Sequence, residues 1–234
     1  MNRISNHSYY SLLMLYSMKD NFIEMSSIID IILKFVFGLC LGSFVNVVTY
    51  RLPRKISIIH PRSYCPNCGK SIRVLDNIPV FSWIRLKGRC SYCSKKIPLR
   101  YLLIEVYFSI LFVISTYSYP YFNSDPDDLL LNIFTSIFLL ILVCISIIDI
   151  DYLIIPSILS LSGIIFGLLF NILNSYLYVF DSSQNIIIYH FIATLLGFII
   201  FEFIRFFGKA IFKKDALGKG DSVLAACLGA WLGM

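Results

Sequence analysis

Charged residues are scarce in this sequence. Asp, Glu, Lys and Arg make up 15% of its 234 residues, whereas about a quarter is usual for a soluble domain. Hydrophobic residues make up 58%, and the 20 Phe and 15 Tyr suit lipid-facing helices with interfacial anchors. The scarcity of charge excludes an ordinary soluble domain and indicates a chain whose main solvent is lipid.

A cleavage site made of small residues is also missing from the first part of the chain. Residues 1–25 contain a short apolar stretch that is followed at once by Lys19, Asp20 and Glu24. We therefore predict no signal peptide and treat residues 1–25 as an N-terminal extension of uncertain role.

Long apolar runs, in contrast, are abundant. A membrane-spanning helix needs about 20 apolar residues, and five stretches of suitable length are found at about 26–50, 101–118, 129–148, 153–174 and 186–207. A sixth apolar segment begins at Ser222 and reaches Met234, which is too short to span. The fold class that we predict is an all-α integral membrane protein with about six transmembrane segments and a small cytoplasmic zinc-binding loop domain.

Basic residues are missing from two of the short loops between the spans. Residues 119–128 and 175–185 carry no Lys or Arg, whereas 51–100 carries 12 with a single acid, Asp76, and 205–220 carries five. Basic loops remain on the cytoplasmic side. The pattern predicts that 51–100 and 205–220 are inside, and it explains the basic loop without nucleic acid, which we do not expect as a partner.

Two aspartates lie at the predicted cytoplasmic ends of spans. Asp149 ends the third span, and Asp221 follows two glycines in Gly218-Lys219-Gly220-Asp221. Each has a simpler interpretation: Asp149 could mark a water-exposed helix turn, and Asp221 could cap the helix that follows it.

The two aspartates together suggest more than either alone. Two carboxyl groups at one site do not easily both ionise, so one keeps a proton. The ionised partner can activate water, while the protonated partner donates to a carbonyl oxygen. If the side chains meet, this is the chemistry of an aspartic protease, and the predicted topology permits it.

Four cysteines form two pairs in the basic loop. Cys65, Cys68, Cys90 and Cys93 follow the pattern C-x2-C-x21-C-x2-C, which is typical of a structural zinc site. Gly69 suits the tight turn of such a knuckle. A redox dithiol pair or free thiols are the alternatives. Cys40, Cys144 and Cys227 lie in apolar segments and are interpreted as small hydrophobic residues.

Several sequence motifs together resemble the prepilin peptidase family, also called type IV leader peptidases, of the GxGD aspartic proteases. The resemblance covers about residues 38–234 and is carried, in order, by residues 42–53, 65–69, 76–83, 88–93, Arg100-Tyr101, Glu105, Asp149, Ile155-Pro156 and 218–221.

The resemblance implies a helical membrane fold with two catalytic aspartates, which fall on Asp149 and Asp221. It implies cleavage of the short basic leader of prepilins and pseudopilins at the cytoplasmic face of the bacterial inner membrane. For members with the four-cysteine loop, it also implies methylation of the new amino terminus with S-adenosylmethionine. The partners that we expect are these leader peptides and membrane lipid.

Three features depart from the family pattern. Val223 stands where Lys is usual, Ser157 stands where Asp or Asn is usual, and family members continue past the segment that ends here at Met234. We expect the chain to be truncated at its C-terminus. The alternative hypotheses are a non-catalytic zinc-bearing component of a pilus or type II secretion assembly and a small-molecule transporter with proton-coupled acids. Glu105 and Glu202 are intramembrane acids, for which a functional role and snorkelling near a helix end are both open. No internal repeat supports the transporter.

Overall fold

The computed structural model describes residues 4–117, 129–178, 183–213 and 217–233. Within these ranges the regular secondary structure is helical, and the only extended pairings are two isolated bridges in the largely irregular loop before α3. The elements in chain order are α1 (Ile4–Arg51), η1 (Val74–Asn77), α2 (Phe81–Arg85), α3 (Leu99–Tyr117), α4 (Leu129–Tyr152), α5 (Ser157–Tyr178), α6 (Ser183–Phe212) and α7 (Lys219–Leu232).

Five of these helices are long and apolar enough to cross a membrane, which confirms the predicted helical membrane fold. The spans are Ile28–Arg51, Leu99–Thr116, Leu130–Tyr152, Ser157–Leu177 and Ile187–Ile211. Large apolar side chains such as Ile165 and Phe206 point outward from them, as lipid contact requires. The predicted sixth segment is α7, whose 14 residues reach about 21 Å and do not span by themselves.

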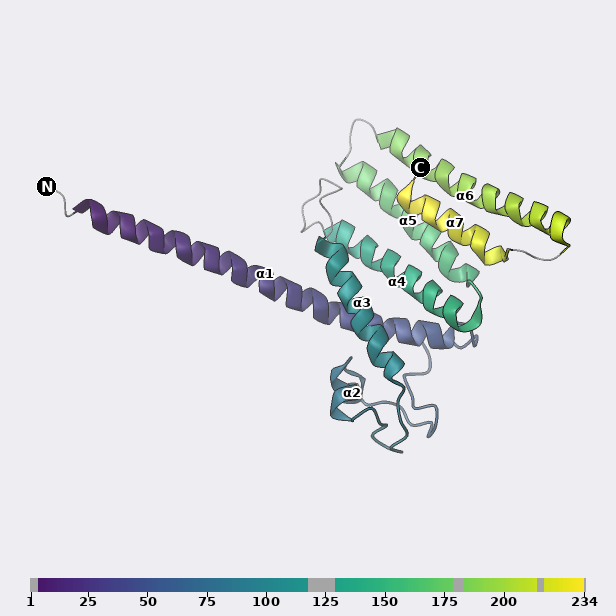
Figure 1. Ribbon diagram of the computed structural model, residues 1–234, viewed down its shortest axis with the longest axis horizontal. Helices are drawn as coiled ribbons and strands as arrows, with labels where there is room; N and C mark the ends of the chain where they lie inside the picture. The colour runs from purple at the N-terminus through teal and green to yellow at the C-terminus, as the bar shows by residue number, and fades with distance from the viewer. Residues whose placement is uncertain (1–3, 118–128, 179–182, 214–216, 234) are drawn as a thin grey trace.

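Helix α1 packs against α3 through small residues. A Cβ added to Gly38 would lie 2.8 Å from the Cα of Ser109, and one added to Gly42 would lie 2.8 Å from the Cα of Glu105. Small residues at these two positions therefore allow the backbones of α1 and α3 to approach closely. Beyond it, the N-terminal part of α1 extends away from the other helices (Figure 1).

Helix α7 lies between α5 and α6 (Figure 1) and packs closely on both. It runs parallel to α5, because Gly163 meets Cys227 and Gly167 meets Trp231 one turn further along. Towards α6, the Cβ positions of Gly197 and Gly229 would lie 2.7 and 2.4 Å from backbone oxygens of Ala225 and Ala193. Glycine is therefore required where α6 and α7 cross, and these contacts fix the position of the helix that carries Asp221.

A buried core joins α1, α3 and α4. Val45, Phe108 and Cys144 are each 0% exposed and pack in one cluster. Cys227 on α7 is also buried, so the interpretation of Cys144 and Cys227 as hydrophobic packing residues fits the structure. Cys40 is exposed on α1.

Candidate active site and metal centre

Asp149 lies in the last turn of α4, where the helix is stopped by its own backbone. The N–H of Leu153 donates to the carbonyl of Asp149 at 2.8 Å, and Leu153 adopts a positive φ of 53°. A left-handed residue after the last turn ends a helix in this way. The side chain of Asp149 is exposed, as the simpler interpretation of a water-facing turn also requires.

Asp221 lies in the first turn of α7 and caps it. Its Oδ2 accepts a hydrogen bond from the N–H of Gly218 at 2.8 Å. A carboxylate at this position also complements the positive end of the helix dipole. The simpler interpretation of Asp221 as a capping acid is therefore observed, and the side chain remains only partly buried.

Gly220 is the second glycine of the motif Gly218-Lys219-Gly220-Asp221. It lies where the two aspartate-bearing segments touch. A Cβ added to Gly220 would lie 2.6 Å from both the Cβ and the carbonyl oxygen of Ile155, in the short apolar connection between α4 and α5. Any side chain here would push the start of α7 away from the end of α4. The ends of the helices that carry Asp149 and Asp221 accordingly lie at the same end of the bundle (Figure 1).

The four predicted cysteine ligands are brought together. Their sulfur atoms all lie within 4.8 Å of one another, and the Sγ atoms of Cys65 and Cys93 are 3.9 Å apart. Four sulfurs placed tetrahedrally about 2.3 Å from a zinc ion would be separated by about 3.8 Å. The donor set therefore fits zinc in number, element and spacing.

The two cysteine pairs have the same backbone structure. The N–H of Cys65 donates to the carbonyl of Lys70 at 3.0 Å, and the N–H of Cys90 donates to that of Lys95 at 2.9 Å. Each turn closes through a left-handed residue, Gly69 as expected in the first and Ser94 in the second.

Hydrogen bonds tune the thiols of this site. The backbone N–H of Lys95 and the amide of Asn67 favour the thiolate of Cys93 and lower its pKa to about 6. The N–H of Lys70 acts in the same direction on Cys68, but partial burial and the neighbouring sulfurs outweigh it and raise that pKa to about 11. Clustered thiols resist joint ionisation in this way, and a bound cation would relieve their repulsion.

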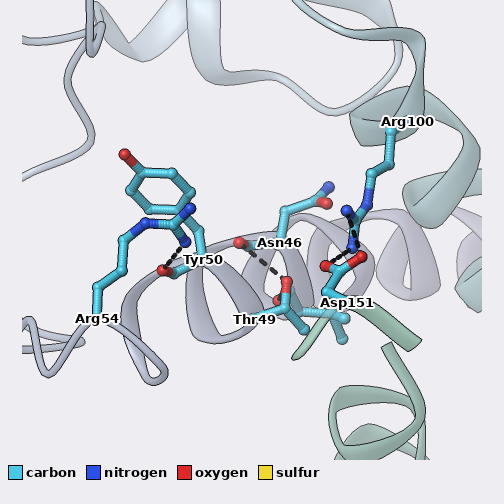
Figure 2. A network of polar contacts seen from close by, with 7 residues as sticks. Asn46, Thr49, Tyr50, Arg54, Arg100 and Asp151 are labelled. Carbon is cyan, nitrogen blue, oxygen red and sulfur yellow. Dashed lines mark hydrogen bonds and ion pairs between the residues drawn. The ribbon is translucent and has the colours of Figure 1, made fainter. Parts of the chain in front are cut away.

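An ion pair that sequence reasoning did not identify ties the end of α4 to the start of α3. Arg100 donates through both terminal nitrogens to the two carboxylate oxygens of Asp151, with one bond at 2.8 Å. Nearby, the guanidinium of Arg54 lies 4.1 Å from the ring centre of Tyr50 and 5.8 Å from that of Tyr152. Figure 2 shows the ion pair beside the end of α1. We call the ion pair of Arg100 with Asp151 the α3–α4 clamp. Its residue Asp151 lies two positions after Asp149 in the sequence.

Glu105 docks the cysteine-bearing loop on the membrane helices. Its Oε2 accepts a hydrogen bond from the N–H of Val80 at 2.8 Å. From α1, the buried Arg51 donates to the carbonyls of Ser57 and Ile58, which fixes the start of the loop. The sequence shows that an acid lies in the span, but it does not show which residues of the distant loop that acid will contact.

Two polar residues of α6 have partners within the bundle. Glu202 accepts from Arg205, three residues later on the same helix. His190 lies 3.2 Å from the carbonyl of Ala230, across the contact between α6 and α7. Both polar groups are therefore satisfied within the bundle.

Two family descriptions match the chain. "Bacterial Peptidase A24 N-terminal domain" covers residues 36–119, and "Type IV leader peptidase family" covers residues 136–234. No solved structure matches the chain significantly.

Named relatives match over most of the chain. A prepilin leader peptidase/N-methyltransferase of Myxococcus xanthus is 33% identical over 85% of this chain and 55% of its own length. A type 4 prepilin-like proteins leader peptide-processing enzyme of Escherichia coli is 33% identical over 86% of this chain and 77% of its own length. A prepilin leader peptidase/N-methyltransferase of Aeromonas salmonicida is 32% identical over 86% and 72%. The chain thus spans about half to three quarters of the length of these relatives.

Proposed function

Because the chain belongs to the type IV leader peptidase family, we propose that it removes the leader peptide of type IV prepilins and pseudopilins and methylates the new amino terminus. The relatives of Myxococcus xanthus and Aeromonas salmonicida carry both activities in their names. The name of the Escherichia coli relative gives leader-peptide processing. The fold supports the proposal with a helical membrane bundle and a four-cysteine loop on one side of it.

Asp149 and Asp221 are the catalytic pair in this proposal. The observation that carries the assignment is the contact of Gly220 with Ile155, which holds the start of α7 against the connection that follows Asp149. One carboxylate would be ionised and take a proton from water, while the other would be protonated and donate to the scissile carbonyl oxygen. Gly218 and Gly220 support the pair: the first donates to Asp221, and the second allows the close approach.

The same end of the bundle faces the cytoplasm of the bacterial inner membrane in this proposal. The basic segment 51–100 and the described residues 205–213 and 217–220 adjoin this end (Figure 1), and basic loops stay inside. A short basic leader remains on that side, so the substrate and the aspartates meet at one face.

Zinc is the metal that we assign to Cys65, Cys68, Cys90 and Cys93. The spacing of the sulfurs and the repeated turn geometry support it. Because all four positions of a tetrahedral ion would be occupied by protein, the metal would hold the loop in shape and would not take part in hydrolysis. S-adenosylmethionine would supply the methyl group.

Leader removal is the reaction that tests the proposal. We expect the purified full chain in lipid vesicles to convert a prepilin to a product that lacks the leader, as measured by mass spectrometry. A non-catalytic component of a pilus or secretion assembly would bind the prepilin and leave its mass unchanged. That result, with correctly inserted protein, contradicts the proposal.

The α3–α4 clamp is expected to position Asp149. Exposed ion pairs contribute only about 0–1 kcal/mol to stability, so Arg100→Ala should leave the bundle folded. Small displacements of catalytic groups are costly, and we expect kcat/KM for leader cleavage to fall about fivefold to tenfold. The measurement is cleavage kinetics with Arg100→Ala and Asp151→Asn.

The charge-reversed double variant, Arg100→Asp with Asp151→Arg, should recover part of the lost rate. Arg89→Ala removes an exposed base of the cysteine-bearing loop that is not part of the clamp. This variant is the control, and its cleavage rate should be unchanged. Equal rates for the wild type and all clamp variants would show that the ion pair does not position the site.

A further inference from the structure

A cavity of about 260 Å³ lies between the cysteine-bearing loop and the ends of α1 and α3. Its walls include Asn46 and Tyr50 from α1, Trp83 and Tyr92 from the loop, and Tyr101 and Glu105 from α3. Neither Asp149 nor Asp221 lines it. Its volume is close to the lower end of the range of about 300–1,000 Å³ that is common for small-molecule sites.

The two acids on the cavity wall differ in their partners. Asp76 forms an ion pair with Arg85 and accepts from Ser91. Glu105 accepts a backbone N–H from Val80, and among the described residues no Lys or Arg forms an ion pair with it. A partly buried carboxylate without a cationic partner favours a positively charged ligand beside it.

Aromatic rings on the cavity wall provide further groups that could contact a ligand. Trp83 and Tyr101 supply aromatic rings whose flat apolar faces suit a nucleobase and whose electron-rich faces attract a cation. The ring of Tyr92 already has cations of this chain over it, with Lys70 at 4.9 Å and Arg73 at 5.1 Å from its centre. The ring of Trp83 is fixed in place: a Cβ added to Gly88 would lie 2.7 Å from its Cζ2, and its Nε1–H donates to the carbonyl of Ile97 at 3.4 Å. A rigid wall of this kind loses little entropy when a ligand binds.

We propose that this cavity binds the methyl donor, S-adenosylmethionine, with the carboxylate of Glu105 as the counter-charge to its positive sulfonium sulfur. The proposal rests on the methyl transfer assigned under the proposed function and names its site. When bound, the donor supplies a methyl group from sulfur to an amine nitrogen; the products are neutral S-adenosylhomocysteine and a methylated amine, and one proton is released. The faces of Trp83 and Tyr101 would accommodate the adenine, and Lys95 and Lys96, which also line the cavity, would pair with the carboxylate of the donor.

The same carboxylate both docks the loop and forms part of the cavity. Because Val80 belongs to the loop and Glu105 to α3, their hydrogen bond brings the two walls together. A Gln at position 105 retains an oxygen that accepts from Val80 but carries no charge. The variant Glu105→Gln therefore separates recognition of the sulfonium from docking of the loop.

Calorimetric titration of the purified full chain in detergent tests the proposal. The ligands are S-adenosylmethionine and S-adenosylhomocysteine, which differ by the methyl group and the positive charge. We expect Glu105→Gln to weaken binding of the cationic donor about tenfold and binding of the neutral product less than about threefold. Glu202→Gln removes a carboxylate from α6, outside the cavity, and should change neither affinity.

Zinc content and protease resistance of Glu105→Gln should equal those of the wild type and show that the loop is still docked. Equal loss of affinity for both ligands would overturn the role of Glu105 as a counter-charge. Absence of donor binding by a wild-type chain that still removes leaders would overturn the cavity assignment and leave the peptidase intact. A wild-type chain that binds the donor without removing leaders would support the cavity and contradict the peptidase.

Discussion

Asp149→Asn and Asp221→Asn are each expected to abolish leader cleavage, with a fall in rate of about a thousandfold or more. Removing either carboxyl group removes one half of the proton transfers, because one acid activates water and the other protonates the carbonyl oxygen. The two act as a unit, so the double variant should be hardly slower than either single variant. The measurement is single-turnover cleavage of a prepilin by chain inserted in vesicles.

Asn is the informative substitution at position 221, because its amide oxygen still accepts the N–H of Gly218 and keeps α7 capped. Loss of that cap in Asp221→Ala would cost about 1 kcal/mol of stability and confuse the result. Asp30→Asn, which changes a half-exposed acid on α1 away from both sites, is the control and should still cleave. Full activity of Asp149→Asn would contradict the assignment and make Asp151 the next candidate.

Loss of the metal is expected to have the second large effect. Cys65→Ser should reduce zinc from one ion per chain to nearly none and open the 51–100 loop to proteolysis. Structural zinc binding contributes about 10–16 kcal/mol in small zinc-binding peptides, and a ~50-residue loop with few buried residues depends on such a contribution. Metal analysis and limited proteolysis of the purified reduced chain measure both effects, and methyl transfer should be lost with them.

The matched control for the metal is Cys40→Ser, which changes an exposed thiol on α1 and should leave the zinc content at one. A loop equally resistant to protease with and without Cys65 would contradict a structural role for the metal. If Cys65→Ser still cleaves the leader but no longer methylates, the metal is needed for methyl transfer and not for cleavage.

Those features that depend on local pattern were predictable from the sequence. The five spans follow from run length, because lipid demands about 20 apolar residues in a helix. The spacing of the cysteines indicated one metal site, because each pair is contained within four residues. The left-handed turn at Gly69 was predictable for the same reason, whereas Ser94 in the equivalent turn carries no such signal.

Contacts between distant segments were not predictable. The hydrogen bond from Val80 to Glu105 and the ion pair of Arg100 with Asp151 depend on how α1, α3 and α4 pack, and many bases in the loop could have paired with either acid. The need for glycine at position 220 likewise becomes clear only when Ile155 is seen against it. The sequence indicated which residues could act, and the fold shows which segments meet.

The central claim is that Asp149 and Asp221 form one site on the cytoplasmic side, and cross-linking tests it most directly. Both aspartates are changed to Cys in a chain in which Cys40, Cys144 and Cys227 are Ala, while the loop cysteines keep their metal. A third thiol at Tyr176, an exposed residue near the far end of α5, reports access from outside. The reagent is a short, membrane-impermeant bifunctional maleimide, added to intact and then to opened vesicles.

We predict that the thiol at position 176 reacts from outside, and that those at 149 and 221 react only after the membrane is opened and are then joined to each other. Mass spectrometry of the linked peptides identifies the bond. Two thiols that are modified separately and never joined, or a thiol at 221 that reacts from outside, would contradict a shared site for the two acids.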